Sequence, residues 1–372
     1  MTYRRAAIPA LLGGVLLTLL LWWAGASAQA LHLRGSAGVF DIESVTELRQ
    51  WLAPWSYDPS AASASTGTGG GTQYADLYRT GMQIRFVAVF VFFVAGALLL
   101  IRRIPPAQGR TPATVLALWA WGPAAGTLAV TISAPWLIAA RGHGSYRVLP
   151  ELAAVIASGG PAMVFAALVS ASVMVLVARI TAEGEDPLPR RDVPPRAARL
   201  AASVGTAVVA LSLVGLSYVS VAAWIQTSFD GGGILSEPGD LLREWLLLGS
   251  WTGPTTMPLG DWLLYRAADA LMLAVVWWSL RLLPGLLTRA TLPVMAVGAV
   301  CATVLGLFAS QLLHMVIDDT ASVWSPVHLF SGLGGGVPAA LTFGVLAGAA
   351  ALATLRLTGE RSPVESPAKS SA

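Results

Sequence analysis

The chain has no asparagine, a single lysine (Lys369), a single cysteine (Cys301) and few charged residues. Without asparagine there is no acceptor for N-linked glycosylation, and one cysteine cannot form an intrachain disulfide. Charged residues make up 12% of the 372 positions, whereas soluble domains carry about 25%. Arginine in place of lysine, with many Ala, Gly and Pro residues, indicates a high-GC bacterial genome.

Familiar catalytic signatures are also missing. The chain has no nucleotide-binding phosphate loop, zinc-protease helix motif, paired-cysteine motif or serine-nucleophile elbow. Its formal net charge of +3 does not indicate nucleic-acid binding. We therefore expect no nucleic-acid partner and no cofactor, and we assign no catalytic residue.

Long hydrophobic runs dominate the remainder. Hydrophobic residues make up 55% of the chain, and runs of roughly 20 residues are long enough to cross a bilayer as helices. This pattern predicts an all-α integral membrane protein with about eight transmembrane helices. The predicted spans are 6–28, 82–101, 113–140, 152–178, 201–225, 263–283, 291–317 and 337–355.

The second half of the chain resembles the first. Four landmarks recur in the same order: Leu48-Arg49-Gln50-Trp51-Leu52 and Leu242-Arg243-Glu244-Trp245-Leu246, Leu77-Tyr78-Arg79 and Leu264-Tyr265-Arg266, Gly159-Gly160-Pro161 and Gly335-Gly336-Val337-Pro338, and Arg179-Ile180-Thr181 and Arg356-Leu357-Thr358. They predict a tandem duplication of a four-span unit. Because four is even, both copies cross the membrane in the same direction, about a pseudo-twofold axis along the membrane normal.

The duplication divides the chain into four parts. Residues 1–182 form the first repeat, 183–198 a cytoplasmic linker, 199–358 the second repeat, and 359–372 a tail expected to be disordered. Each repeat has a long outer segment between its first and second spans, at 29–81 and 226–262.

Most of the 23 basic residues fall in loops on the side of the N-terminus, which predicts that both termini are cytoplasmic. We expect a multi-pass protein of the bacterial plasma membrane. Tyr3-Arg4-Arg5, the apolar run and Ala26-Ser27-Ala28 also resemble a cleavable signal peptide. We favour retention of this span, because the span at 201–225 needs a counterpart.

Both outer segments contain amphipathic patterns. Ser44 and Glu47 have the spacing of a capping box, and Pro238 suits a first helical turn. We favour helices that lie on the outer membrane surface, anchored by tryptophan. The alternative is a lid over a cavity between the repeats.

Two constellations could bind ligands at the predicted outer side. Glu151 and His328 each lie ten residues before matching prolines, so they would face each other across the pseudo-axis as an acid–base or cation-binding pair. His314 and Asp318 lie one helical turn apart and are a conceivable metal site. For each, the simpler interpretation is a polar residue at the wet end of a span.

Arg79 and Arg266 could hold an anionic group, or they could extend to the membrane interface beside their tyrosines. Arg85 lies deeper and is replaced by Met272 in the second copy, and Asp269 replaces Met82. Asp269 could pair with Arg85 across the halves or with Arg266 at i,i+3, and the sequence does not separate these alternatives.

Small residues at helical spacing predict close helix packing. They are Gly122 with Gly126, Gly344 with Gly348, and Gly298, Ala302 and Gly306. The two glycine–proline motifs should break or kink the fourth and eighth spans, and paired breaks are typical of transporter binding sites.

Three functions are compatible with these patterns. We favour a transport or permease-type protein with an outward-facing site between the repeats. The alternative is a non-catalytic scaffold or accessory subunit that binds an envelope protein partner through its outer segments. An outer-leaflet lipid-modifying enzyme ranks below both. Apart from the lipid bilayer, the sequence specifies neither a ligand nor an oligomeric state.

Overall fold

The computed structural model describes residues 3–30, 71–104, 110–140, 148–157, 161–182, 194–228, 237–254, 258–288, 290–317 and 333–359. These residues form helices and contain no strand. Eight of the helical segments are long and apolar enough to cross a membrane, which confirms the predicted class. Ser44, Glu47, Asp318, His328, most of the 183–198 linker and nearly all of the tail lie outside the described residues.

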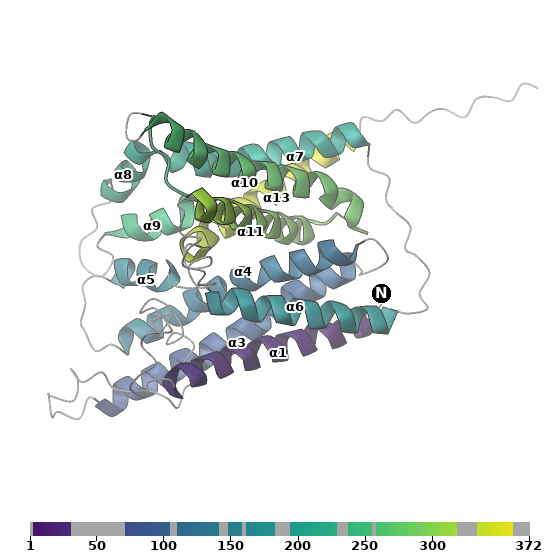
Figure 1. The fold of residues 1–372 in the computed structure, drawn as a ribbon. Coiled ribbons are helices and arrows are strands. Elements are labelled where there is room, and N and C mark those ends of the chain that lie inside the picture. Colours follow the sequence, from purple (N-terminus) through teal and green to yellow (C-terminus); the bar gives the residue numbers. More distant parts are fainter. Residues whose placement is uncertain are drawn as a thin grey trace, which may run out of the picture.

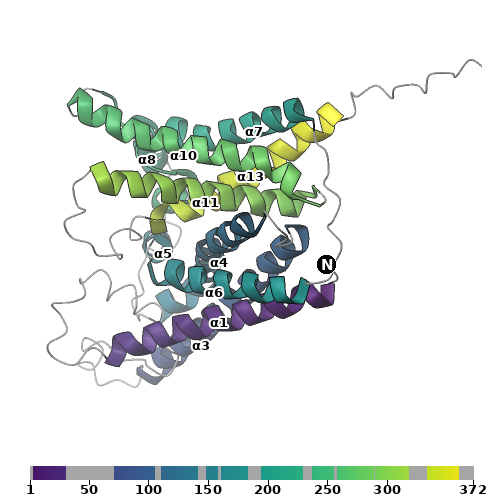
Figure 2. The same ribbon diagram turned by 45° about the vertical axis from the view of Figure 1, so that its right-hand side comes forward.

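In the first half, four long helices form a closed ring. They are α1 (Tyr3–Ala30), α3 (Gly71–Arg103), α4 (Thr111–Ala139) and α6 (Pro161–Ala182). Helix α1 packs against α3, α3 against α4, α4 against α6, and α6 against α1. Figures 1 and 2 show these helices on one side of the bundle.

The second half forms a ring with the same order of contacts. Its helices are α7 (Pro195–Ala210), α10 (Leu259–Leu286), α11 (Leu292–Ile317) and α13 (Leu333–Gly359). Helix α7 packs against α10, α10 against α11, α11 against α13, and α13 against α7. Each spanning helix of the second half therefore has neighbours equivalent to those of its counterpart in the first half.

The two rings meet along α4, which packs against α11 and α13. The Trp119 ring in α4 meets Phe308 of α11 edge to face, with 4.5 Å between ring centroids. At the N-terminal end of the bundle, the amide of Thr288 donates a hydrogen bond of 3.1 Å to the carbonyl of Arg103. Helices α4, α11 and α13 are the most buried spans, so the centre of the fold lies at this junction.

The predicted small-residue contacts are confirmed. A methyl group on Gly122 would lie 2.2 Å from Ala167 of α6, and one on Gly306 would lie 2.9 Å from a carbonyl of α10. A methyl group on Gly344 would lie 2.7 Å from the Cα of Val300 in α11. One on Gly348 would lie 2.5 Å from the Met295 carbonyl of the same helix. Because lipid tails are as apolar as leucine, such close backbone approach supplies much of the packing energy between membrane helices.

The fourth and eighth spans, in each of which the sequence predicts a break or a kink, differ from each other. The span predicted at 152–178 consists of α5 (Val148–Ala157) and α6, and only α6 meets the length and hydropathy of a membrane span. Its counterpart α13 continues through Pro338. The predicted break in the eighth span is therefore wrong: Pro338 lies inside α13, and the helix continues on both sides of it. A kink at this proline, the other outcome expected from the sequence, stays a prediction.

The fifth span is interrupted where the sequence predicted a plain helix. Helix α7 is followed by a π-helix, η2 (Leu211–Leu216), and by a short helix α8 (Val219–Thr227). The hydroxyl of Ser217 donates to the Ser212 carbonyl at 2.8 Å, and that of Ser212 donates to the Leu246 carbonyl. The amide of Trp251 donates to the Ser217 carbonyl at 2.8 Å. The segment after residue 246 thus satisfies polar groups that the interruption releases, as membrane burial requires.

The second outer segment contains α9 (Pro238–Leu246), with Pro238 in the first turn as predicted. Helix α9 packs against α8, α5 and α13. The short helices α5, α8 and α9 gather at the end of the bundle opposite the N-terminus (Figure 1). Helix α9 therefore contacts both halves of the chain.

Candidate functional site

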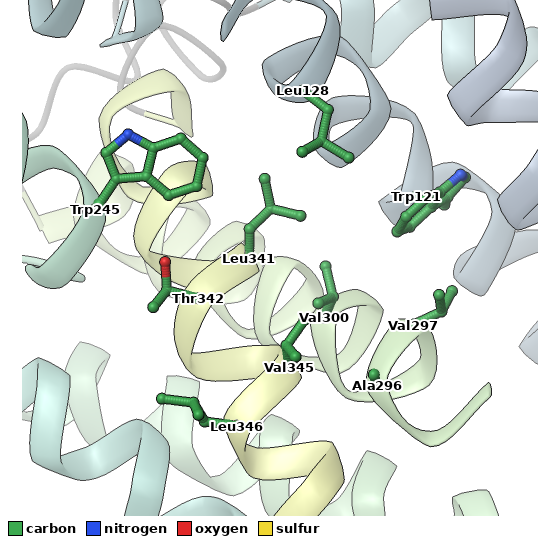
Figure 3. A pocket seen from close by; sticks show the side chains of 10 residues that line it. All are labelled: Trp121, Leu128, Trp245, Ala296, Val297, Val300, Leu341, Thr342, Val345 and Leu346. Carbon is green, nitrogen blue, oxygen red and sulfur yellow. The ribbon is translucent and has the colours of Figure 1, made fainter. Parts of the chain in front are cut away.

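An apolar cavity of about 480 Å³ lies at the junction of the two halves. Its walls come from α4 of the first half and from α9, α11 and α13 of the second (Figure 3). The lining residues are Trp121, Leu128, Trp245, Ala296, Val297, Val300, Leu341, Thr342, Val345 and Leu346. The volume lies within the roughly 300–1,000 Å³ typical of ligand sites.

The wall formed by α4 is held by contacts with α3. Gly96 has no side chain, and a methyl group there would lie 2.0 Å from the Trp121 indole nitrogen. The indole N–H donates a 3.0 Å hydrogen bond to the carbonyl of Phe92. Trp121 is therefore fixed in one orientation, with its polar atom used inside the first half.

The opposite wall follows from the approach of α13 to α11. Gly344 and Gly348 bring the two backbones together, and residues 341, 342, 345 and 346 occupy the neighbouring rows of α13 that line the cavity. The Thr342 hydroxyl, the one side-chain hydroxyl in the wall, donates to the Pro338 carbonyl at 3.3 Å. The surface that this wall presents to a ligand is therefore also mainly hydrocarbon.

None of the polar residues singled out from the sequence lines this cavity. Arg79 is exposed and forms an ion pair of 3.6 Å with Asp76, one turn earlier in α3. Glu151 is half-buried in the first turn of α5. Its predicted partner His328, and the Asp318 partner of His314, lie outside the described residues.

Arg85 is buried in α3, with 1% of its surface exposed. Its Nε donates a 2.9 Å hydrogen bond to the hydroxyl of Ser133 in α4. This contact lies within the first half and joins two helices of the same ring, so we assign Arg85 a structural role.

Asp269 pairs with Arg266 and not with Arg85. Arg266 Nη1 lies 2.9 Å from Asp269 Oδ2, and the side chains are 13% and 12% exposed. The two atoms form an ion pair without the alignment of a hydrogen bond. The Arg266 guanidinium also stacks on the Trp251 ring at 3.8 Å. Of the two alternatives left open by the sequence, the local i,i+3 pair is therefore the one formed.

Arg79 and Arg266 both follow the repeated Leu-Tyr, but their surroundings differ. The side chain of Arg79 is exposed, whereas that of Arg266 is largely buried. The adjacent Tyr265 ring contacts the His314 ring, with 5.4 Å between centroids. Among the described residues no group of three or more His, Cys, Asp or Glu side chains has the arrangement of a metal site.

Helix α9 carries a half-buried carboxylate beside the cavity-lining Trp245. Glu244 Oε2 is buried, and no described residue donates a hydrogen bond to it. Burial raises the pKa of the Glu244 carboxyl above its ordinary value, Arg243 opposes this shift, and Asp240 adds to it. The side-chain amide of Gln226 in α8 donates a 2.8 Å hydrogen bond to the carboxylate of Asp240, one turn before Glu244 in α9.

This carboxyl should make the stability of the protein depend on pH. The folded state holds the Glu244 proton more tightly than the unfolded chain, so stability should fall as pH rises above the ordinary value of 4.5. It should level off once the folded carboxyl has ionised. Replacing Glu244 with glutamine should remove this part of the fall, measured as melting temperature against pH in detergent.

Asp261→Asn is the matched variant, because it removes an exposed carboxyl near the same end of the molecule. It measures how far surface carboxyls in general contribute to the slope. A Glu244→Gln curve with the same slope as that of the unmodified protein would contradict the role assigned to burial.

Sequence reasoning missed the cavity because it looked for polar and ionisable groups. All the lining residues except Thr342 are apolar or aromatic, and hydropathy does not distinguish a side chain that faces a cavity from one that faces lipid. The nearest sequence signal was Gly344 with Gly348, which fixes the approach of α13 to α11. No family model matches this chain, and no curated protein or solved structure is significantly similar to it.

Proposed function

We propose that this chain is a transport-type membrane protein that holds its ligand between two like four-helix halves. The observation that carries the proposal is the cavity of about 480 Å³ at the contact between the halves. Transporters built from repeats bind their substrates at the repeat interface. A junction packed without a cavity would have favoured a purely structural role.

The two halves are proposed to be copies of one ancestral unit. Their rings have the same order of helix contacts, and the repeated sequence landmarks fall in the same order. Helices α4 and α11, the third spans of the two halves, pack against each other. Such a contact between equivalent helices is expected beside a twofold axis along the membrane normal.

We place the N-terminal end of the bundle in the cytoplasm of a bacterial cell. The helix ends at that side carry most of the basic residues of the described chain: Arg5, Arg102, Arg103, Arg110, Arg179, Arg196, Arg199, Arg281 and Arg356. An excess of arginine in cytoplasmic loops is the usual determinant of orientation. Helices α5, α8 and α9 then lie at the outer side, where α9 covers the junction.

A scaffold that binds an envelope protein is the second candidate. Helix α8 and its first flanking residue expose Tyr218 and Trp224 at the end that we place outside. Exposed aromatic residues there suit a protein partner, although they also suit the membrane interface. The cavity between the halves has no role in this function, so it separates the two candidates.

The proposal is tested by native mass spectrometry of the protein purified in mild detergent. We expect a stoichiometric small-molecule adduct that is lost in Leu346→Trp, where the indole fills the cavity mouth. Leu357→Trp is the control, because Leu357 lies on the same face of α13 three turns away and is 64% exposed. A protein without adducts, with the two variants alike, would contradict transport and favour the scaffold.

A further inference from the structure

The walls of the cavity offer almost no polar group to a ligand. The N–H of Trp121 and the hydroxyl of Thr342 are already bonded to the carbonyls of Phe92 and Pro338. The remaining polar atom is the indole nitrogen of Trp245, which is turned away from Leu341 and Thr342 (Figure 3). A sugar, amino acid or ion would lose its hydration in this site and gain no bonds in return.

The cavity opens on the side of the bundle, as the exposure of two of its lining residues shows. Val345 and Leu346 line it, yet they are 47% and 50% exposed. Both lie near the middle of the membrane span Gly336–Thr358. At that depth the surroundings of the protein are hydrocarbon, so the mouth faces the interior of the bilayer.

Neither water nor a void suits this space. Water needs two to four polar partners, and apolar cavities of about 150 Å³ stay dry and take up small hydrocarbons. This cavity is roughly three times larger. Leaving it empty would deprive the lining side chains of dispersion contacts, whereas a hydrocarbon chain restores these contacts without desolvating any polar group.

We propose that the occupant is the acyl chain of a membrane lipid, which enters sideways past Leu346. The inference rests on the proposed function, because it names the ligand class of that site. The chain lies among the aliphatic residues of α11 and α13, and the headgroup remains at the α9 end. Trp245 at that end carries an indole N–H for which no described residue supplies an acceptor.

The test uses the full chain in nanodiscs of phosphatidylcholine that carries a photoreactive diazirine in its acyl chain. After illumination, adducts are mapped to peptides by mass spectrometry. We expect labelling of residues 296–300 and 341–346, its loss in Leu346→Trp, and its retention in Leu357→Trp. Leu346→Phe gives a second, smaller blockage if the tryptophan variant does not fold. Labelling that is equal in the blocked and control variants overturns the inference.

A second measurement separates failure of this inference from failure of the proposed function. In a Cys301→Ala background, Thr342→Cys and Gly260→Cys are treated in nanodiscs with a membrane-impermeant maleimide. We expect rapid reaction at position 260, which is exposed and has no atom close to its absent side chain, and none at 342.

Equal reaction rates at positions 260 and 342 would mean a water-filled site. That result overturns the lipid and leaves a transporter of a soluble ligand. No photolabel in the cavity and no maleimide reaction at 342 would overturn both proposals, because the junction would then admit no ligand.

Discussion

Gly348→Ala should lower the melting temperature of the protein, although alanine is the better helix former. In a helix interior the exchange alone gains about 1 kcal/mol. A methyl group at position 348, however, would lie 2.5 Å from the Met295 carbonyl and 2.7 Å from Ala296 Cα. Backbone atoms cannot move aside as a side chain does, so α13 and α11 must separate. We expect a net loss of about 1–3 kcal/mol, measured by thermal or denaturant unfolding in detergent.

Gly285→Ala is the matched control. Gly285 lies in α10, and no atom lies within 4 Å of the position that its Cβ would occupy. This variant should keep or raise the melting temperature because helix propensity acts there without a clash. Stabilisation of both variants to the same degree would show that the α11–α13 contact does not depend on glycine at position 348.

Asp269→Leu should be among the most destabilising single substitutions in the chain. It leaves the Arg266 guanidinium, 13% exposed in the structure, without the carboxylate 2.9 Å away. Removing one partner from a buried ion pair costs about 3–5 kcal/mol, because the remaining charge is uncompensated. The Trp251 ring at 3.8 Å offsets a part of this loss through its cation–π attraction. Unfolding in detergent, read from secondary structure, measures the effect.

The double variant Arg266→Leu/Asp269→Leu provides the decisive comparison. Replacing both charges with apolar residues removes the uncompensated group, so the double variant should be more stable than Asp269→Leu alone. Arg79→Leu is a further control, since its pairing with Asp76 is solvent-exposed and contributes little. Additive losses in the double variant would show that Arg266 and Asp269 are not energetically coupled.

The positions of the spans followed from the sequence with small errors. Each predicted run falls on a helix or helices of the structure, because 20 apolar residues satisfy their backbone polar groups in lipid by forming a helix. The main correction in length is α3, which begins at Gly71, eleven residues before the predicted start at 82. A helix can continue beyond the membrane through polar residues, and hydropathy does not show that such residues are helical.

The interruption of the fifth span was not predictable in the same way. Ser212 and Ser217 are ordinary residues in a membrane helix, and the interruption depends on their distant partners. The Leu246 carbonyl accepts a hydrogen bond from the Ser212 hydroxyl, and the Trp251 amide donates one to the Ser217 carbonyl. Those partners are more than 30 residues away in the chain. A local pattern therefore gave no sign that the helix would change there.

The sequence by itself determined that the chain is a helical membrane protein with eight spans, and which small residues allow close packing. These properties depend on the length and periodicity of local segments. The tertiary structure decided that Asp269 pairs with Arg266, that Pro338 leaves α13 unbroken, and that an apolar cavity lies between α4, α11 and α13. The partner of Asp269 and the place of the cavity depend on which faces of separate helices meet. Apolar faces that meet a cavity, a neighbour or lipid have the same composition, so the sequence does not distinguish them.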